Sequence, residues 1–180
     1  MLPVGKRYVS ARTGGWIQIV ERTPDSGSFE RLLKPHTGRA DPHLHLDFTQ
    51  TWEAVQGMGC IEVDGAERPF AAGDREVITP GRPHRDPWNP GPGELIVRGT
   101  FRPLPPFSEA YAEALAHHFR EGTTNEQDEM PLLQIFAIAA ETDGQSYRAG
   151  IPVALQKATL PLASRIARLR GFPTRFEDAS

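Results

Sequence analysis

The sequence has almost no cysteine: Cys60 is the only one in 180 residues. A single thiol cannot form an internal disulfide, and without an assignable histidine partner it is better explained as a small buried apolar side chain than as a nucleophile. A chain of this length buries enough apolar surface to fold without disulfides or a structural metal. These features suit a reducing compartment, and we expect a cytoplasmic protein.

Long apolar runs are also missing. The longest, "LLQIFAIAA" at 132–140, is half the length of the roughly 18 residues that a membrane-spanning helix requires. The first ten residues, "MLPVGKRYVS", hold no apolar segment of the kind found in signal peptides. We therefore expect neither a membrane span nor a signal peptide.

Neither sign of charge dominates, since the net charge is −3 at pH 7. Such a balance gives no general attraction to nucleic acid or to anionic membranes. The C-terminal segment is basic and has no interleaved aromatics, which is typical of a solvated helix face; its arginines are Arg165, Arg168, Arg170 and Arg175. No helix-turn-helix is evident. We expect a small molecule, and no nucleic acid or membrane, as the partner.

Glycine and proline, 17 of each, punctuate the first part of the chain. Up to about residue 106 they separate short runs that alternate apolar and polar residues, such as "WIQIVE" at 16–21, and this spacing is typical of an antiparallel sandwich or barrel. Asp64-Gly65 is a strong hairpin signal. We predict a mainly β domain over residues 1–106.

The remainder, 107–180, has helical periodicity. Helices are predicted at 107–121, 131–140 and 152–170, and Pro161 is expected to kink or divide the third. The segment 122–129, "GTTNEQDE", has the composition of an exposed loop. We expect this helical extension to pack on the barrel or on a second subunit.

Candidate chemistry begins with the histidines. His43 and His45 alternate in a strand-like run and therefore point to the same face, close enough to share an ion. Such a pair on a polar strand more often decorates a surface, so its spacing alone is a weak signal. The later segment 73–91 adds His84 after two turns, the second at Pro80-Gly81.

Together these segments resemble the two motifs of the cupin superfamily, over roughly residues 28–102. The first motif is matched by Gly38, His43, His45, position 50 and Gly57, and the second by Gly73, Gly81, His84 and Asn89. The departures from the family spacing are small. Gly38 is one residue closer to His43 than the first motif has it, Thr79 stands where the second motif usually has a proline, and Asn89 follows His84 one residue later than usual. The resemblance implies an antiparallel double-stranded β-helix, or jelly roll, with a metal inside.

In that family three histidines and one carboxylate hold a divalent transition metal such as Fe, Mn, Ni or Zn. The resemblance therefore implies His43, His45 and His84 as ligands, and the fourth position falls on Gln50 rather than on a glutamate. Spacing supports this assignment, because Glu53 lies too far from His45. Strand parity agrees, since Gln50 shares a face with Trp52 while Glu53 lies on the other.

A glutamine ligand is neutral, so the ion would keep its full charge, favour anionic substrates and lack an adjacent general base. The alternative is a metal-free barrel that only binds a ligand. Trp52 and Arg98 are candidates for substrate binding, although core packing for Trp52 and solvent exposure for Arg98 are the more common uses of such residues.

We expect a metal-dependent enzyme, most simply a dioxygenase acting on an enol or phenol. Open imidazole sites suit simultaneous binding of oxygen and substrate. Isomerase or lyase chemistry through a metal-held enolate, and non-catalytic binding of a small molecule, are the alternatives. Cupins commonly pair through their sheets, so the resemblance also implies a homodimer.

Overall fold

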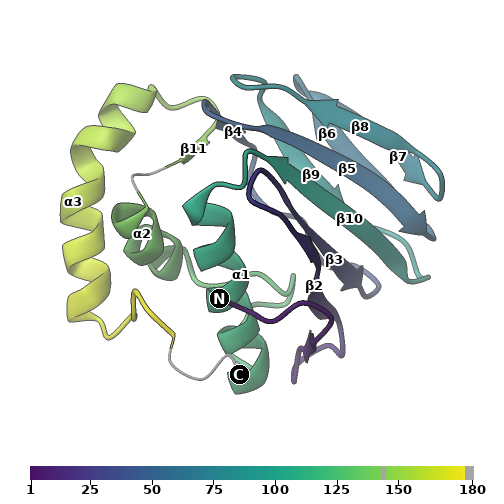
Figure 1. The fold of residues 1–180 in the computed structure, drawn as a ribbon, viewed down its shortest axis with the longest axis horizontal. Helices are drawn as coiled ribbons and strands as arrows, with labels where there is room; N and C mark the ends of the chain where they lie inside the picture. The colour runs from purple at the N-terminus through teal and green to yellow at the C-terminus, as the bar shows by residue number, and fades with distance from the viewer. Residues whose placement is uncertain (143–144, 177–180) are drawn as a thin grey trace.

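The computed structural model describes residues 1–142 and 145–176, and it consists of a β-barrel with helices on one side (Figure 1). The strands are β1 (Arg7–Val9), β2 (Trp16–Arg22), β3 (Gly27–Leu33), β4 (His43–His45), β5 (Thr49–Gln56), β6 (Met58–Val63), β7 (Ala66–Ala71), β8 (Arg75–Ile78), β9 (His84–Trp88), β10 (Leu95–Arg102) and β11 (Ser146–Arg148). The helices are α1 (Pro106–Glu121), α2 (Leu132–Glu141) and α3 (Val153–Leu169).

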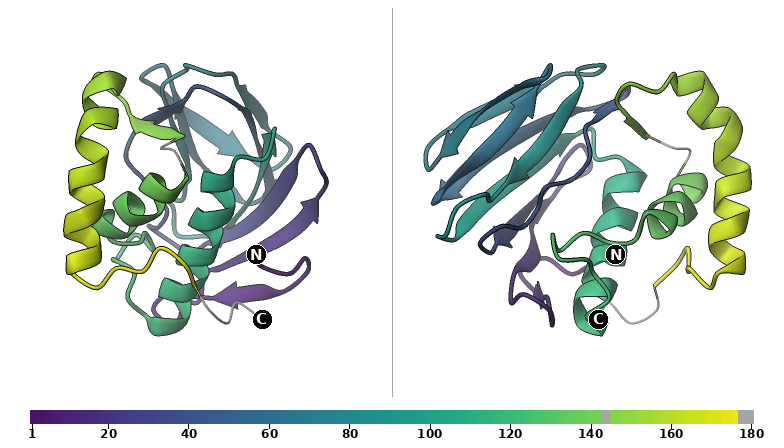
Figure 2. Two further views of the ribbon diagram at one scale, coloured as in Figure 1. Left: turned by 60° about the vertical axis from the view of Figure 1, so that its left-hand side comes forward. Right: turned by 180° about the vertical axis from the view of Figure 1, so that it is seen from behind.

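The strands form two antiparallel sheets with the order β1-β2-β3-β10-β5-β8 and β11-β4-β9-β6-β7. Within them, β3-β10-β5-β8 faces β4-β9-β6-β7, so the chain passes back and forth between the two sheets (Figure 2). Eight strands connected in this way are a jelly roll. The predicted fold class is confirmed.

Alternation along the strands separates the barrel interior from its outside. In β5 the side chains of Gln50, Trp52 and Ala54 are buried and those between them are only partly so. Trp52 pairs across the sheet with Gly99 of β10, where an added Cβ would lie 3.0 Å from the indole ring. Glycine at this position therefore makes room for Trp52, against which Phe29 packs edge-on at 5.5 Å.

The Asp-Gly hairpin forms as predicted. Asp64 and Gly65 have φ values of 53° and 79° and join β6 to β7, with Val63 opposite Ala66. Positive φ at both central residues is the geometry of a type I′ turn, which matches the twist of the flanking strands.

The helices lie beyond one side of the barrel, with α1 nearest to the strands and α3 outermost (Figures 1 and 2). All three predicted helices are present, and α3 continues through Pro161. The predicted division is therefore wrong: Pro161 is exposed, so water can solvate the carbonyl that loses its partner. No helix among the described residues is long and apolar enough to span a bilayer.

One strand of the C-terminal region escapes the sequence patterns. The three residues of β11, from within the predicted helical extension 107–180, pair with β4 and so extend the second sheet. A three-residue strand has too little alternation to be recognised. The extension is consequently hydrogen-bonded to the barrel as well as packed beside it.

The loop 122–129 is less exposed than its composition predicts. Thr124 and Asp128 are 3% and 2% exposed, and Asp128 accepts hydrogen bonds from the hydroxyls of Thr124 (3.0 Å), Ser10 (2.8 Å) and Thr13. These partners lie more than 100 residues away along the chain, except for Thr124. Polar loop residues are buried here because they satisfy one another.

Replacing Asp128 by alanine should therefore destabilise the protein by roughly 3 kcal/mol, because three hydroxyls lose a charged acceptor in a buried setting. Urea unfolding followed by circular dichroism measures this. The exposed Asp25→Ala variant is the control and should change stability by less than about 0.5 kcal/mol. Equal stability of the two variants would contradict the network.

Candidate metal centre

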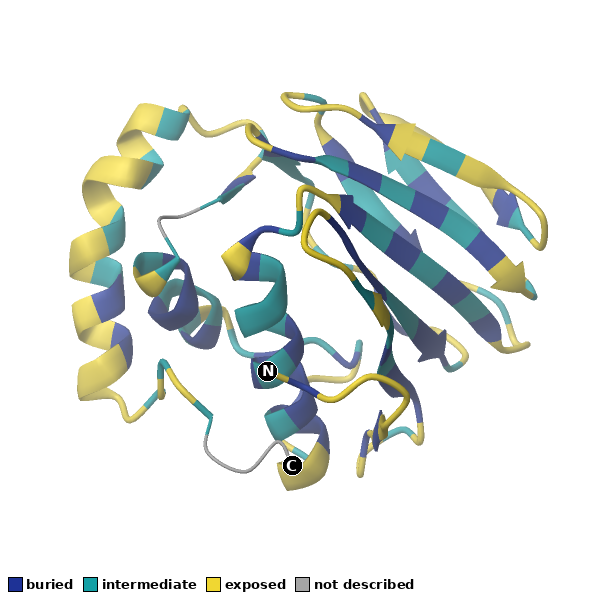
Figure 3. Ribbon diagram, viewed as in Figure 1, coloured by how far each residue is buried: buried dark blue, intermediate teal, exposed yellow. Residues whose placement is uncertain are grey.

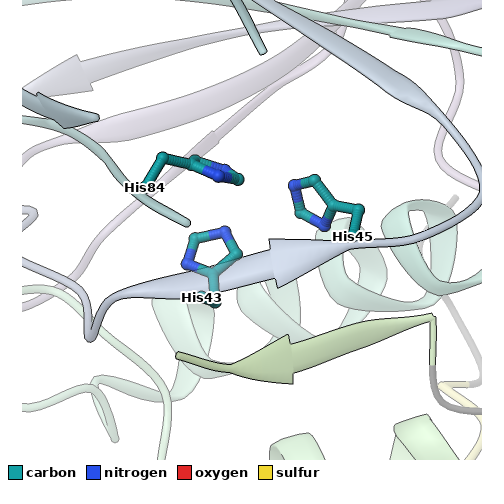
Figure 4. A group of neighbouring side chains, drawn as sticks. All are labelled: His43, His45 and His84. Carbon is teal, nitrogen blue, oxygen red and sulfur yellow. The ribbon is translucent and has the colours of Figure 1, made fainter. Parts of the chain in front are cut away.

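Three histidines converge inside the barrel (Figure 4). His43 and His45 come from β4, and His84 comes from β9, directly opposite His43 in the sheet register. One ligand atom of each lies within 4.8 Å of those of the other two. The structure thus brings together the three histidines that the sequence motifs single out.

Gln50 completes the group from the opposite sheet. It is 2% exposed, and its Oε1 lies 2.8 Å from Nε2 of His45 and 3.0 Å from Nε2 of His84. Two ligands bound at right angles to one ion, with bonds of about 2.1 Å, are separated by about 3.0 Å. The spacing suits a shared metal ion.

Hydrogen bonds on the far side of the rings show which nitrogens face the centre. Nδ1 of His43 and of His84 each lie 3.0 Å from a backbone carbonyl, that of Asp41 and of Arg82 respectively. A nitrogen next to a carbonyl must carry the proton, so in the neutral ring Nε2 presents its lone pair to the centre. This is the orientation found in metal-bound histidines.

The same reasoning makes the contact between His84 and Gln50 unfavourable without a cation. The Gln50 amide nitrogen donates to Oδ1 of Asp86 at 3.5 Å, which directs Oε1 toward the histidines. The lone pairs of His84 Nε2 and Gln50 Oε1 then face each other at 3.0 Å. A positive ion between two acceptors removes this repulsion, so the residues fit a bound metal.

Burial keeps the rings of His45 and His84 neutral. Desolvation, followed by repulsion from His43 and His84, lowers the pKa of His45 to about 3. Desolvation and His43 likewise lower the pKa of His84 to about 4. Neutral imidazole is the form that binds metal, so both side chains are ready for coordination at neutral pH.

Comparison with solved structures returns cupin and double-stranded β-helix proteins. They include KdgF from Halomonas sp. (25% identity, TM-score 0.46, 51% of this chain and 80% of that one) and a cupin-superfamily sugar phosphate isomerase from Silicibacter pomeroyi (16%, 0.48, 56% and 72%). A double-stranded β-helix protein from Klebsiella pneumoniae is 26% identical, with a TM-score of 0.45 over 53% of this chain and 84% of that one. No family model and no curated protein sequence matches the chain.

The two sheets have the jelly-roll strand order, and the three histidines of the two sequence motifs meet inside the barrel. The barrel has the cupin fold.

A carboxylate that the sequence motifs do not include also reaches the cupin centre. Oδ1 of Asp86, in β9, lies 3.7 Å from Nε2 of His43 and 3.6 Å from Nε2 of His84. It accepts a hydrogen bond from Nε1 of Trp52 at 3.0 Å. Burial opposes the charge on Asp86, but attraction to His43, His84 and His45 and the Trp52 bond give a net lowering of its pKa. Asp86 lies two residues after His84 in β9, so the two side chains share a face of the strand, and this spacing is visible in the sequence.

The two predicted substrate-binding residues have different positions. Trp52 is 2% exposed, lines the cavity and also orients Asp86. Arg98 lies on the outer face of β10, where it donates to Oε1 of Glu30 at 2.6 Å and lies 3.9 Å from Glu53. Its predicted projection into the cavity is wrong, because Leu95, Val97 and Phe101 occupy the inward positions of that strand. Glu53 is on the outer side too, as its parity predicts.

His118 and Cys60 lie outside the three-histidine centre. His118 is buried, and its Nδ1 lies 2.6 Å from the Thr123 hydroxyl, so it is a packed residue of α1. Cys60 is unpaired and half-buried, and burial raises the pKa of its thiol, which lowers its nucleophilicity at neutral pH.

The purified protein should bind close to one equivalent of a divalent transition metal after loading, and His84→Ala should weaken this binding by more than about a hundredfold, because a direct ligand is lost. Competition with a chelating dye measures the affinity. The exposed His36→Asn variant is the control and should bind as wild type. Less than about a tenth of an equivalent in the reloaded wild type would rule out the site.

Without metal, stability should fall with acid in a specific window. The unfolded histidines take up protons below about pH 6.5, whereas His45 and His84 resist protonation until about 3 and 4. The unfolded state therefore binds more protons in this interval, which costs up to roughly 1.4 kcal/mol per pH unit for each group.

Urea unfolding in chelator at pH 7.5 and 5.5 tests this expectation. The His84→Asn variant should lose less stability between the two values than wild type does, because one of the two resisting groups is gone. An identical loss in both proteins would contradict the assignment.

Proposed function

We propose that the protein is a metal-dependent enzyme that acts on a small, oxygen-bearing organic molecule. The observation that carries this proposal is the pair of acceptors, His84 Nε2 and Gln50 Oε1, that face each other at 3.0 Å in a buried centre. His43, His45, His84 and Gln50 would hold the ion. As all four ligands are neutral, a bound divalent ion retains its charge and polarises a substrate oxygen.

Asp86 favours proton-transfer chemistry, as in an isomerase or lyase. Its carboxylate lies beside the histidines and lines the same cavity, with 27% of its side chain exposed. A carboxylate in this position takes a proton from a carbon next to a polarised carbonyl and returns it to a neighbouring atom. The indole of Trp52 and the amide of Gln50 both donate to Oδ1, which fixes the orientation of the base.

Oxygenation of an enol or phenol is the second candidate. It is favoured by the size of the cavity, about 980 Å³, which leaves space for a substrate and a small second molecule beside the histidines. Oxygen uptake by Fe(II)-loaded protein with catechols, flavonols and diketones tests it. Exchange of substrate C–H hydrogen with deuterated water under nitrogen tests proton transfer instead. If neither is seen with any of the candidate metals while ligands raise the melting temperature, the protein is a binding module.

Asp86→Asn should lower the rate of hydrogen exchange or isomerisation by about a hundredfold or more, because the amide cannot accept the proton. Metal content, measured by mass spectrometry, should remain near that of wild type, since the four proposed ligands are intact. Glu53→Gln, on the outer face, is the matched control and should leave the rate unchanged. Full activity in Asp86→Asn would exclude its role as the base.

A homodimer and a cytoplasmic location remain predictions. Leu162, Ile166 and Leu169 on α3 are 65%, 44% and 79% exposed, and sedimentation of the purified protein measures whether a second copy covers them.

A further inference from the structure

The cavity extends well beyond the histidines. It runs from His43, His45 and Asp86 in the barrel to the C-terminal helices. Its far part, here called the helical chamber, is lined by Ile135, Phe136, Ala139, Tyr147, Leu160 and Ala163. These side chains come from α2, β11 and α3, so the region after residue 106 builds a wall of the pocket as well as covering the barrel.

Helix α2 is apolar on two opposite sides, which explains its nearly uniform sequence. One side, with Ala137 and Ile138 at 0% exposure, packs into the protein core. The other side carries Leu132, Ile135, Phe136 and Ala139 at spacings of three and four residues, and all four line the cavity. Ala139 also belongs to the apolar core and Ile135 packs against it, so this face is shared between protein and cavity. The part of an apolar helix face that lines a cavity is a surface for an apolar ligand.

Helix α3 supplies the facing wall. Leu155, Thr159, Leu160 and Ala163 line the cavity at helical spacing. Leu160 and Ala163 are half-buried, whereas Leu155, at 55% exposure, and Thr159 lie at the open side of the cavity, and the outer side of the helix is exposed (Figure 3). From β11, the 4% exposed Tyr147 closes the chamber near β4. The six side chains that define the chamber carry no charge, and five of them are fully apolar. Arg148 of β11 and Gln156 and Thr159 of α3 also line the cavity.

The opposite end of the cavity is polar and charged. Arg31 is 8% exposed and pairs with Glu129 at 3.4 Å, and its buried Nε has no hydrogen-bond partner among the described residues. Tyr111 donates to the same glutamate at 2.9 Å. The other charged residues of the lining are paired, Arg39 with Glu67 at 3.5 Å and Arg148 with Asp41 at 3.1 Å. With a divalent ion bound, the ion and Arg31 together exceed Asp86 and Glu129 by one positive charge. A single negative group on the ligand balances this excess.

We propose that the protein binds an amphipathic monoanion, with a carboxylate or enolate at the histidine end and an apolar body of about eight or more carbons in the helical chamber. Only the placement of the ligand's acid group at the histidines rests on the proposed metal-dependent function; the placement of its apolar body does not. The cavity volume of about 980 Å³ lies at the upper end of the range for small-molecule sites, about 300–1,000 Å³, whereas a short hydroxy acid or keto acid would leave the chamber empty.

Chain-length dependence tests the apolar part. Calorimetry with butanoate and decanoate as probes should show tighter binding of decanoate by at least about fiftyfold, because each buried methylene is worth about a factor of four. Decanol, which has the same apolar body without the acid, should bind more weakly than decanoate. Equal affinity for butanoate and decanoate would overturn the proposal.

Filling the chamber tests its location. Ala163→Trp places an indole in the chamber and should weaken decanoate binding at least about tenfold, the equivalent of about two methylenes, while butanoate binding is unchanged. Ala158→Trp, on the exposed side of the same helix, is the matched control and should bind both acids as wild type does. Unchanged decanoate binding by Ala163→Trp would overturn the proposal.

Methyl NMR of the wild-type protein provides a measurement that needs no variant. Decanoate should shift the methyl signals of Ile135 and Leu160 in the chamber and leave Leu169, which is 79% exposed, unaffected. Shifts that avoid the chamber would contradict the proposal even if Ala163→Trp fails to fold.

The same titrations with and without chelator separate the two proposals. If metal binds but chain length has no effect, the chamber proposal fails and the metal-dependent function stands. If decanoate fills the chamber but the protein holds no metal, the chamber proposal stands and the metal-dependent function fails.

Discussion

The contact between Gln50 and the histidines is the interaction on which the site depends. It joins the two sheets across the barrel interior, because Gln50 comes from β5 while His45 and His84 come from β4 and β9. The amide is oriented by Asp86, and two of the rings are oriented by backbone carbonyls. Every one of these orientations leaves acceptors directed at one point, so a positive charge there makes the arrangement favourable.

Asp86 supplies a carboxylate near the centre, although Gln50 stands where the family motif has one. With Gln50 as a neutral ligand, the motif alone suggests a centre without a base. The structure places a carboxylate beside the rings from the other motif strand, held by Trp52 and Gln50. The negative charge has not been lost from the site but lies next to the histidines, in the position of the proposed base.

The sequence predicts the barrel and its ligands well because both depend on local patterns. Glycine turns, alternation in β5 and β10, and the spacing of His43, His45 and Gln50 are each contained in a short stretch. Parity correctly excludes Glu53, and the same rule applied to β9 would have put Asp86 beside His84. Arg98 has the opposite parity to Leu95, Val97 and Phe101, and its ion pair with Glu30 shows that this parity is the outer face of β10.

Features that depend on distant partners were not predictable in the same way. The burial of Asp128 needs Ser10 and Thr13, and β11 exists because β4 offers it an edge. Composition made 122–129 look exposed, since polar residues are buried only when they find partners elsewhere in the chain. The apolar face of α2 could be recognised in the sequence, but the cavity that it lines could not.

The pairing of β11 with β4 has a consequence for the order of events during synthesis. The strand that carries His43 and His45 is bordered by β9 on one side and by Ser146–Arg148 on the other, about a hundred residues later in the chain. Before β11 has been synthesised, the edge of β4 that faces away from β9 has no strand partner. The strand that carries two of the three clustered histidines therefore gains its second neighbour only after residue 148 has emerged, late in the synthesis of this region.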